Sequence, residues 1–275
     1  MMATLAAAAP AAPSFFASLV ERQRTLTYYG SALLMLALVT AAVQLFDTRL
    51  LNGVNVWVKP TKFFVSVGVF SLTAAWFFGY VRPDRRRSRP MRAVVALIVL
   101  AGTFELAWIS WQASQGLASH FNNSTVFYAI MYGLMGLFAV ILVGTTLPLA
   151  WEIGRRPARG LQPPFVAAVV IGLLLTFILG GGLGGYMSSQ AGHAVGPEGS
   201  GLPLFGWNRL GGDLRVAHFF GVHAEQALPL MAWFARDLAT PTRWAVTLGG
   251  GALYALLTVA VFVQAVAGLP LISPG

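Results

Sequence analysis

Residues 62–115 have the sequence KFFVSVGVFSLTAAWFFGYVRPDRRRSRPMRAVVALIVLAGTFELAWISWQASQ, in which two apolar stretches flank a run of arginines. The apolar stretches cover about 62–81 and 93–115. A helix needs roughly 20 apolar residues to cross a bilayer core ~30 Å thick, and each stretch has that length. An arginine cluster of this kind is retained on the cytoplasmic side of a membrane. These residues therefore predict a pair of membrane helices joined by a cytoplasmic loop.

The rest of the chain has the same character. Hydrophobic residues make up 57% and charged residues 10% of the sequence, with a mean hydropathy of +0.70. Soluble domains are less apolar and carry about a quarter charged residues. We predict an all-α, polytopic integral membrane protein with seven transmembrane helices near 27–47, 62–81, 93–115, 125–150, 164–188, 215–235 and 244–268.

Basic residues predict the orientation of these helices. With the 82–92 loop inside, 13 of the 18 lysines and arginines lie on the cytoplasmic side and five lie outside, namely Arg49, Lys59, Lys62, Arg209 and Arg215. This asymmetry places the N terminus in the cytoplasm and the C terminus outside, and we expect the inner (cytoplasmic) membrane of the cell. The net charge of +9 is accounted for by loops next to lipid headgroups, so we expect the bilayer and no nucleic acid as partner.

We divide the chain into a flexible cytoplasmic tail, 1–24, and a single transmembrane domain, 25–270. The tail is rich in Ala and Pro and lacks the basic segment that begins a secretory signal. The sequence contains no cysteine, which excludes disulfides, thiolate metal sites, iron–sulfur clusters and covalently attached c-type haem.

Ionisable residues inside the apolar stretches indicate a functional site, because a charge in the hydrocarbon core is costly. Glu105 lies near the middle of the third stretch. Along that helix Glu105, Trp108, Gln112 and Gln115 follow at spacings of three, four and three, which aligns them on one face directed toward His120. We expect this face to point into the bundle.

The sixth stretch carries a second polar group, composed of His218, His223, Glu225 and Gln226. His218 and Glu225 are seven residues apart and share a helical face. His218 and His223 are five apart, about 140° around the axis, so they cannot bind one ion as a pair four apart would. We expect this part of the helix to face the protein and not the lipid.

All four histidines, His120, His193, His218 and His223, fall in or beside segments on the outer side. Histidine is the most common metal ligand, so their one-sided distribution suggests a single site. Neutral imidazoles with a carboxylate suit zinc, copper or iron, with Glu105 or Glu225 as ligand or proton-transfer group. Haem b is the alternative and would need a loop histidine folded inward. Lys62, Gln112, Gln115, Arg215 and Gln226 are candidate cofactor-binding residues around this site, of which Lys62 and Arg215 would attract an anionic group.

One long connection, one glycine-rich segment and the distribution of polar residues give further indications of a site. The outer connection 189–214 is long and rich in Gly and Pro, which is typical of a lid or of a plain surface loop. The glycines at 180–185 would let another helix or a planar ligand approach the backbone. The inner halves of the predicted helices hold few polar residues beyond Ser and Thr, so the pattern favours a pocket that opens outward.

Two segments resemble uncharacterised bacterial multi-pass membrane proteins: Phe104-Glu105 through Ser119-His120-Phe121-Asn122, and Gly212-Asp213-Leu214-Arg215-Val216-Ala217-His218-Phe219. That resemblance implies no activity. The chain is also faintly similar to haem A synthase and cytochrome b561-type bundles, in which a Gly- and Pro-rich outer loop leads into a helix with an axial histidine. The resemblance implies such a role for His218, although the partner histidine of those families is missing here.

We therefore expect a membrane protein that binds a metal ion or haem and acts as an oxidoreductase on a small molecule from the outer side. Two alternatives remain open. The first is a proton-coupled transporter or channel in which Glu105, Glu225 and His223 carry protons. The second is an assembly or scaffold protein in which buried polar residues only fix helix pairing.

Overall fold

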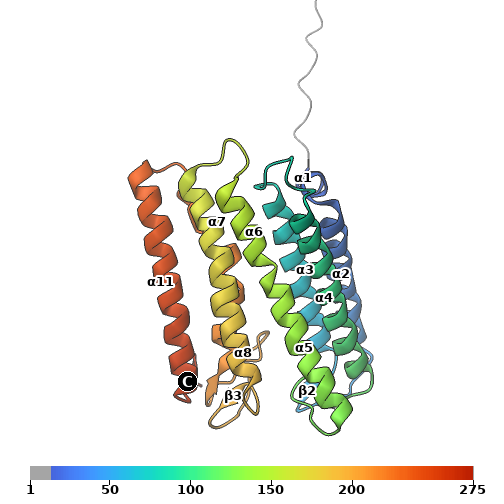
Figure 1. The fold of residues 1–275 in the computed structure, drawn as a ribbon. Coiled ribbons are helices and arrows are strands. Elements are labelled where there is room, and N and C mark those ends of the chain that lie inside the picture. The colour runs from blue at the N-terminus through green and yellow to red at the C-terminus, as the bar shows by residue number, and fades with distance from the viewer. Residues whose placement is uncertain (1–13, 275) are drawn as a thin grey trace, which may run out of the picture.

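The computed structural model describes residues 14–274, which form a bundle of long helices (Figure 1). Six helical segments are long and apolar enough to cross a membrane: Arg24–Val43, Val58–Phe78, Arg89–Ser114, Val126–Arg155, Pro163–Ser188 and Thr240–Val266. They comprise α2 (Arg24–Val43), α3 (Val58–Phe78), α4 (Arg89–Ser114), α5 (Val126–Gly144) with α6 (Thr146–Arg155), α7 (Pro163–Leu175) with the π-helix η1 (Thr176–Gly181) and α8 (Gly182–Ser188), and α11 (Thr240–Val266). The prediction of an all-α, polytopic membrane protein is confirmed at this level.

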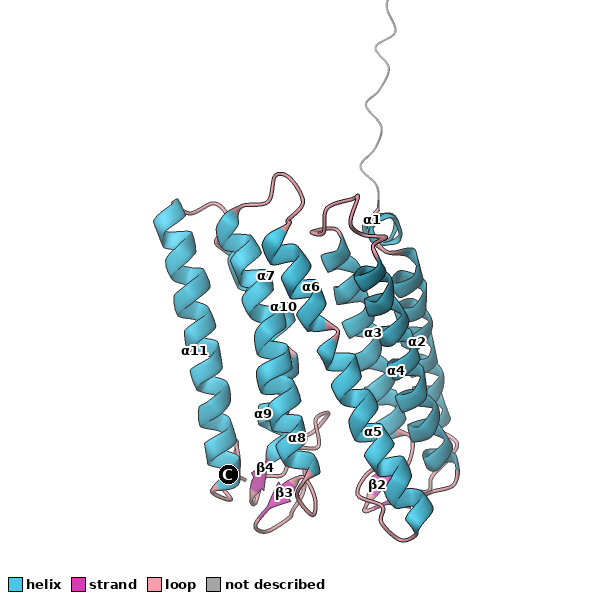
Figure 2. Ribbon diagram, viewed as in Figure 1, coloured by secondary structure: helices cyan, strands magenta, loops and turns pink. Residues whose placement is uncertain are grey.

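The predicted helix at 215–235 is not continuous. It consists of α9 (Leu214–Val222) and α10 (Ala224–Phe234), which follow one another through the bundle (Figure 2) and are separated by His223 with φ −93° and ψ 4°. Neither piece has the length of a complete membrane helix, so this segment is not among the six. Within α10, Pro229 has no N–H to donate to the carbonyl of Glu225, which further interrupts the helical hydrogen bonding.

Two ends of the bundle differ in their connections. We call one the arginine end, since it carries α1 and the connections 79–88, 156–162 and 235–239. The other is the hairpin end, which carries the connections 44–57, 115–125, 189–213 and the C-terminal segment (Figure 1). At the hairpin end β1 (Leu50–Leu51) pairs with β2 (Val54–Asn55) and β3 (Ala194–Val195) pairs with β4 (Gly212–Asp213), both antiparallel. These four short strands are small additions to the predicted helical fold.

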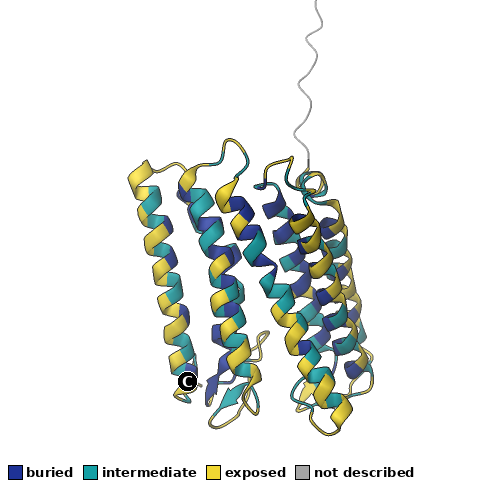
Figure 3. Ribbon diagram, viewed as in Figure 1, coloured by how far each residue is buried: buried dark blue, intermediate teal, exposed yellow. Residues whose placement is uncertain are grey.

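Apolar packing is densest toward the arginine end. One core cluster joins α1, α2, α3, α4, α6 and α7 through buried side chains that include Leu26, Phe78, Ile98, Ile153 and Leu173. Exposed residues run along the full length of the helices (Figure 3). Many of them are large apolar side chains, as expected for surfaces in contact with lipid. The interior at the arginine end is therefore mainly apolar, with the buried Glu152 as a charged exception that pairs with Arg85.

The predicted tail ends earlier than we expected. Residues 1–13 lie outside the described part of the chain, but α1 (Phe15–Arg22) forms within the predicted flexible segment. Ser14 caps this helix by accepting a hydrogen bond from the nitrogen of Ala17 at 3.2 Å. Leu19 is buried, and the Arg22 guanidinium lies 3.6 Å from the centre of the Trp76 ring. Residues 15–22 of the segment that we expected to be flexible therefore form a helix, which these contacts stabilise.

Candidate functional site

Two interrupted helices cross inside the bundle. Contacts join η1 to α9, and the closest approach is at Gly180 and Gly221. A Cβ atom on Gly221 would lie 2.6 Å from the backbone nitrogen of Gly180, and one on Gly180 would lie 2.8 Å from a methyl carbon of Val222. The glycines therefore permit backbone contact between the helices, which is the packing role that the sequence suggested for the 180–185 run.

The break between α9 and α10 leaves backbone carbonyls without partners in their own helix. Side chains of neighbouring helices donate hydrogen bonds to them. The hydroxyl of Thr176, the first residue of η1, donates to the carbonyl of Val222 at 3.5 Å and accepts from the nitrogen of Glu225 at 3.0 Å. The hydroxyl of Tyr254 on α11 donates to the carbonyl of Phe220 at 2.6 Å. The break is thus built into the packing, since irregular backbone at membrane depth requires protein partners.

Glu225 lies at this crossing and is only 2% exposed. Its Oε1 accepts a hydrogen bond from Nε2 of Gln226 at 2.9 Å. The same amide nitrogen donates to the hydroxyl of Thr73 on α3 at 3.2 Å. Nδ1 of His223 donates to Oε1 of Gln226 at 3.2 Å. The amide of Gln226 therefore links the buried carboxyl of Glu225 on α10 to Thr73 on α3.

His218 is held by the other helix of the crossing. Its Nδ1 lies 2.9 Å from the carbonyl oxygen of Gly180. A carbonyl can only accept, so Nδ1 carries the proton and Nε2 retains its lone pair. A Cβ atom on Gly184 would lie 2.8 Å from Cε1 of His218, so this glycine leaves room for the imidazole ring.

A second group of polar side chains surrounds Lys59 in the first turn of α3. Its ammonium donates to Nδ1 of His120 at 3.0 Å, and Ser119 Oγ lies 3.1 Å from the same nitrogen. The indole of Trp108 donates to the carbonyl of Ser119 at 3.2 Å. Glu105 faces this group from α4, is 3% exposed, and its Oε1 has no hydrogen-bond partner among residues 14–274.

His120 is neutral at physiological pH. Burial and the positive charge of Lys59 lower its pKa from 6.5 to about 3. Since the Lys59 ammonium donates to Nδ1, the ring proton is on Nε2. His120 therefore accepts a hydrogen bond from a cation and adds no charge to the site.

A third group joins the connection 189–213 at the hairpin end to α3 and α9. Lys62 Nζ donates to the carbonyl of Phe205 at 2.8 Å, and Arg215 donates to the carbonyl of Gly206 at 2.6 Å. Arg215 also forms an ion pair at 2.6 Å with Asp213, whose side chain is 1% exposed. Burial and, next, the charge of Arg215 lower the pKa of His193 in this loop. We expected the loop that contains Phe205 and Gly206 to be a lid or a plain surface loop. It is attached to α3 by Lys62 and to α9 by Arg215.

The predicted residues fall into these three groups. His218, His223, Glu225 and Gln226 lie at the crossing, and Glu105 and His120 lie beside Lys59. Lys62, His193 and Arg215 lie at the connection 189–213. The structure does not bring all four histidines together. Within residues 14–274, no group of three or more His, Asp or Glu side chains is placed to hold a metal ion.

The predicted stripe on the third helix is only partly buried. Glu105 and Gln112 are buried, and Nε2 of Gln112 donates to the carbonyl of Ala118 at 3.1 Å, so this amide fixes the following loop. Gln115 is exposed and its side-chain amide donates to the neighbouring Ser114, because α4 ends at Ser114 and the helical spacing no longer applies. Gln115 therefore does not belong to the candidate site.

Sequence reasoning missed Lys59, Thr73 and Thr176. Lys59 was counted among charges in an outer connection, but α3 begins at Val58, four residues before the predicted start. Pro60 in the first turn was the available signal, since proline is frequent at helix starts. The two threonines gave no signal, because hydroxyl groups in membrane helices usually bond their own backbone.

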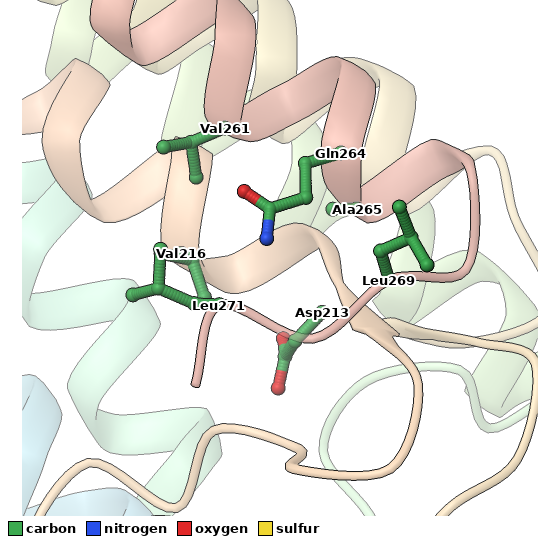
Figure 4. A pocket seen from close by; sticks show the side chains of 7 residues that line it. All are labelled: Asp213, Val216, Val261, Gln264, Ala265, Leu269 and Leu271. Atoms are coloured by element: carbon green, nitrogen blue, oxygen red, sulfur yellow. The ribbon is translucent and has the colours of Figure 1, made fainter. Parts of the chain in front are cut away.

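A separate pocket at the hairpin end does not belong to this site. It lies between α9, α11 and the C-terminal segment (Figure 4) and is lined by Asp213, Val216, Val261, Gln264, Ala265, Leu269 and Leu271. The amide of Gln264 donates to the carbonyl of Pro270 at 2.7 Å, which fixes the C-terminal segment beside it. The carboxylate of Asp213 is already engaged by Arg215, so the pocket offers no free charge.

No family model, no curated protein and no solved structure matches the chain.

Proposed function

We propose that the protein is a proton-coupled carrier of a small solute, with Glu105 and Glu225 as its proton-binding groups. The observation that carries the proposal is the position of Glu225. It is buried where the π-helix η1 crosses the break between α9 and α10, and it bonds to both Thr176 and Gln226.

Interrupted helices support transport for a physical reason. Membrane helices normally satisfy all of their backbone groups internally, and breaks are tolerated where they are buried in protein or line a cavity. In secondary transporters such breaks form the substrate and coupling-ion sites near the bilayer midplane. π-helical turns are likewise frequent at functional sites. A break, a π-helix and a buried carboxyl at one crossing fit this pattern better than a scaffold, which needs no broken helix.

The proposed topology has seven spans, with α9 and α10 together as the sixth. The arginine end is then cytoplasmic, and it carries α1 and 13 of the 18 basic residues. The C terminus is extracytoplasmic and the membrane is the inner membrane of the cell. Fusion of alkaline phosphatase after Gly275 should give an active reporter in a bacterial host, and an inactive fusion at that position contradicts the topology.

Proton coupling can be tested in proteoliposomes that enclose a pH-sensitive dye. Sugars, amino acids, monocarboxylates and inorganic ions are added outside, one class at a time, and internal acidification is recorded. We expect one class to drive proton entry in the wild-type protein and in Asp237→Asn, an acid-to-amide control at an exposed position. Glu225→Gln should abolish the solute-driven entry. The proposal fails if wild-type vesicles match protein-free vesicles with every class.

Ligation of a metal ion or haem by His218 is a second candidate, favoured by one observation. Its Nδ1–H donates to the carbonyl of Gly180, which orients Nε2 as a ligand does when its other nitrogen is bonded to the backbone. An absorption spectrum and metal analysis of the purified protein test this candidate. A Soret band or one metal per chain that His218→Ala removes would support it, and a colourless, metal-free protein would contradict it.

A further inference from the structure

Two lysines at the hairpin end have no acidic partner. Lys59 and Lys62 lie in the first turns of the 21-residue helix α3. No ion pair among residues 14–274 includes either of them. The start of a helix carries the positive end of its dipole, which disfavours cations there. The protein therefore maintains two uncompensated positive charges at an unfavourable position.

A third cation, Arg215, lies near the two lysines. The positive charge of Arg215 on α9 repels those of both lysines. Asp213 neutralises Arg215 through a two-pronged ion pair and is not available to Lys59. His193 and His120, the other titratable groups near Lys59, have lowered pKa values and add no positive charge at neutral pH. This end of α3 is thus positive, and neither lysine forms an ion pair with an acid among residues 14–274.

Glu105 is the one acid that faces Lys59, and it does not form an ion pair with it. The two charges interact through space, yet both carboxyl oxygens of Glu105 lie more than 4.0 Å from Lys59 Nζ. Its Oε1 is buried and has no hydrogen-bond partner in the described chain. An orphaned buried carboxyl oxygen is rare in folded proteins and calls for a ligand or a functional explanation.

We infer that Lys59 and Glu105 form the binding site for a small organic monocarboxylate, which enters together with one proton. The ligand carboxylate accepts a charge-assisted hydrogen bond from the Lys59 ammonium. Two carboxylates side by side repel each other, so Glu105 binds a proton when the anion arrives. The protonated Glu105 then donates a hydrogen bond to the ligand. This inference rests on the proposed carrier function and names its substrate class.

The surrounding side chains favour an organic anion over phosphate or sulfate. The ring of Phe63 lies 5.8 Å from Lys59 Nζ, and the rings of Phe63 and Tyr132 lie 5.9 and 6.0 Å from the ring of His120. Aromatic walls suit the apolar part of a carboxylate, whereas a strongly hydrated inorganic dianion gains nothing from them. One uncompensated lysine beside a titratable acid also balances a single negative charge.

Calorimetric titration of the purified protein in detergent tests the site, with benzoate, acetate and phosphate as probes. Repeating each titration in two buffers of different ionisation enthalpy gives the number of protons taken up. We expect benzoate to bind with uptake of about one proton, acetate more weakly, and phosphate not at all. Binding of benzoate without proton uptake, or preferential binding of phosphate, overturns the inference.

Variants assign the result to the two side chains. Lys59→Met should weaken benzoate binding by about tenfold or more, the equivalent of one charge-assisted hydrogen bond, and Lys59→Arg should restore most of it. Glu105→Gln should still bind benzoate but without proton uptake. Arg92→Gln removes a positive charge from an exposed position in the first turn of α4 and should bind as wild type. Wild-type affinity in Lys59→Met, with an unchanged melting temperature, overturns the assignment.

The two proposals can fail separately. Benzoate binding with proton uptake, but no benzoate-driven proton entry in vesicles, would retain the site and reject the carrier. Proton entry driven by a different solute class, without benzoate binding, would retain the carrier and reject the substrate class.

Discussion

The crossing of the two interrupted helices can be tested by one methyl group. Gly221→Ala places a Cβ atom 2.6 Å from the nitrogen and 2.8 Å from the Cα of Gly180. Both atoms belong to the backbone and cannot rotate away, so the helices must separate. Overpacking of this kind costs about 1–3 kcal/mol. Gly185→Ala is the matched control, because nothing lies within 4 Å of its new methyl group.

Both substitutions replace glycine by alanine in a helix, which alone stabilises by about 1 kcal/mol. That gain cancels in the comparison, and the difference between the variants reports the clash. At roughly 2–4 °C per kcal/mol for a chain of this size, Gly221→Ala should melt about 2–12 °C below Gly185→Ala. Intrinsic tryptophan fluorescence during heating in detergent measures both. Equal melting temperatures would show that the backbones do not meet at Gly221.

Two further predictions concern the ends of the bundle. Arg85→Gln removes the 2.9 Å ion pair with Glu152, whose side chain is 7% exposed, and should lower the free energy of unfolding by about 1–3 kcal/mol, while the exposed control Arg87→Gln should not. The pKa of His120 is lowered from 6.5 to about 3, so the unfolded state binds more protons below pH 6.5 and stability falls as the pH drops toward 3. Wild type should lose up to about 2 kcal/mol between pH 6.5 and 5 relative to His120→Gln, and parallel melting curves of the two proteins over that range would contradict this.

The helices could be predicted from sequence because the bilayer imposes a length. Apolar stretches of about 20 residues located all six long segments, with ends within five residues of the observed ones. Arg82 through Arg92 predicted a loop at the end of the bundle where the other arginine-rich connections also lie. Hydrophobic length and charge are local properties, so they can be seen without knowledge of the packing.

The break at His223 could not be predicted in the same way. His223 itself does not exclude a helix, and the stretch has the apolar length of a single span. The break persists because Thr176 and Tyr254, from two other helices, bond the released carbonyls. These partners come from distant parts of the chain, so the interruption is a property of the packing.

The buried acids were visible, but their surroundings were not. Glu105 and Glu225 stood out as charges in apolar stretches, and both are buried. Their partners depend on which helices are neighbours, and helical spacing within one stretch does not give that. Lys59 approaches Glu105 only because α2, α3 and α4 pack together. The sequence therefore located the ionisable groups and left their grouping to the structure.

Access to the interior from both sides of the membrane tests the carrier most directly. Thr73 on α3 faces α10, where its hydroxyl accepts a hydrogen bond from Gln226. The natural sequence contains no cysteine, so a cysteine introduced at this position is the only one that can react. Thr73→Cys can be treated with a membrane-impermeant maleimide in right-side-out and in inside-out vesicles. A carrier with alternating access predicts labelling from both sides, with rates that change when the solute is added. Labelling from neither side, or from one side at a rate independent of every solute class, would contradict the account.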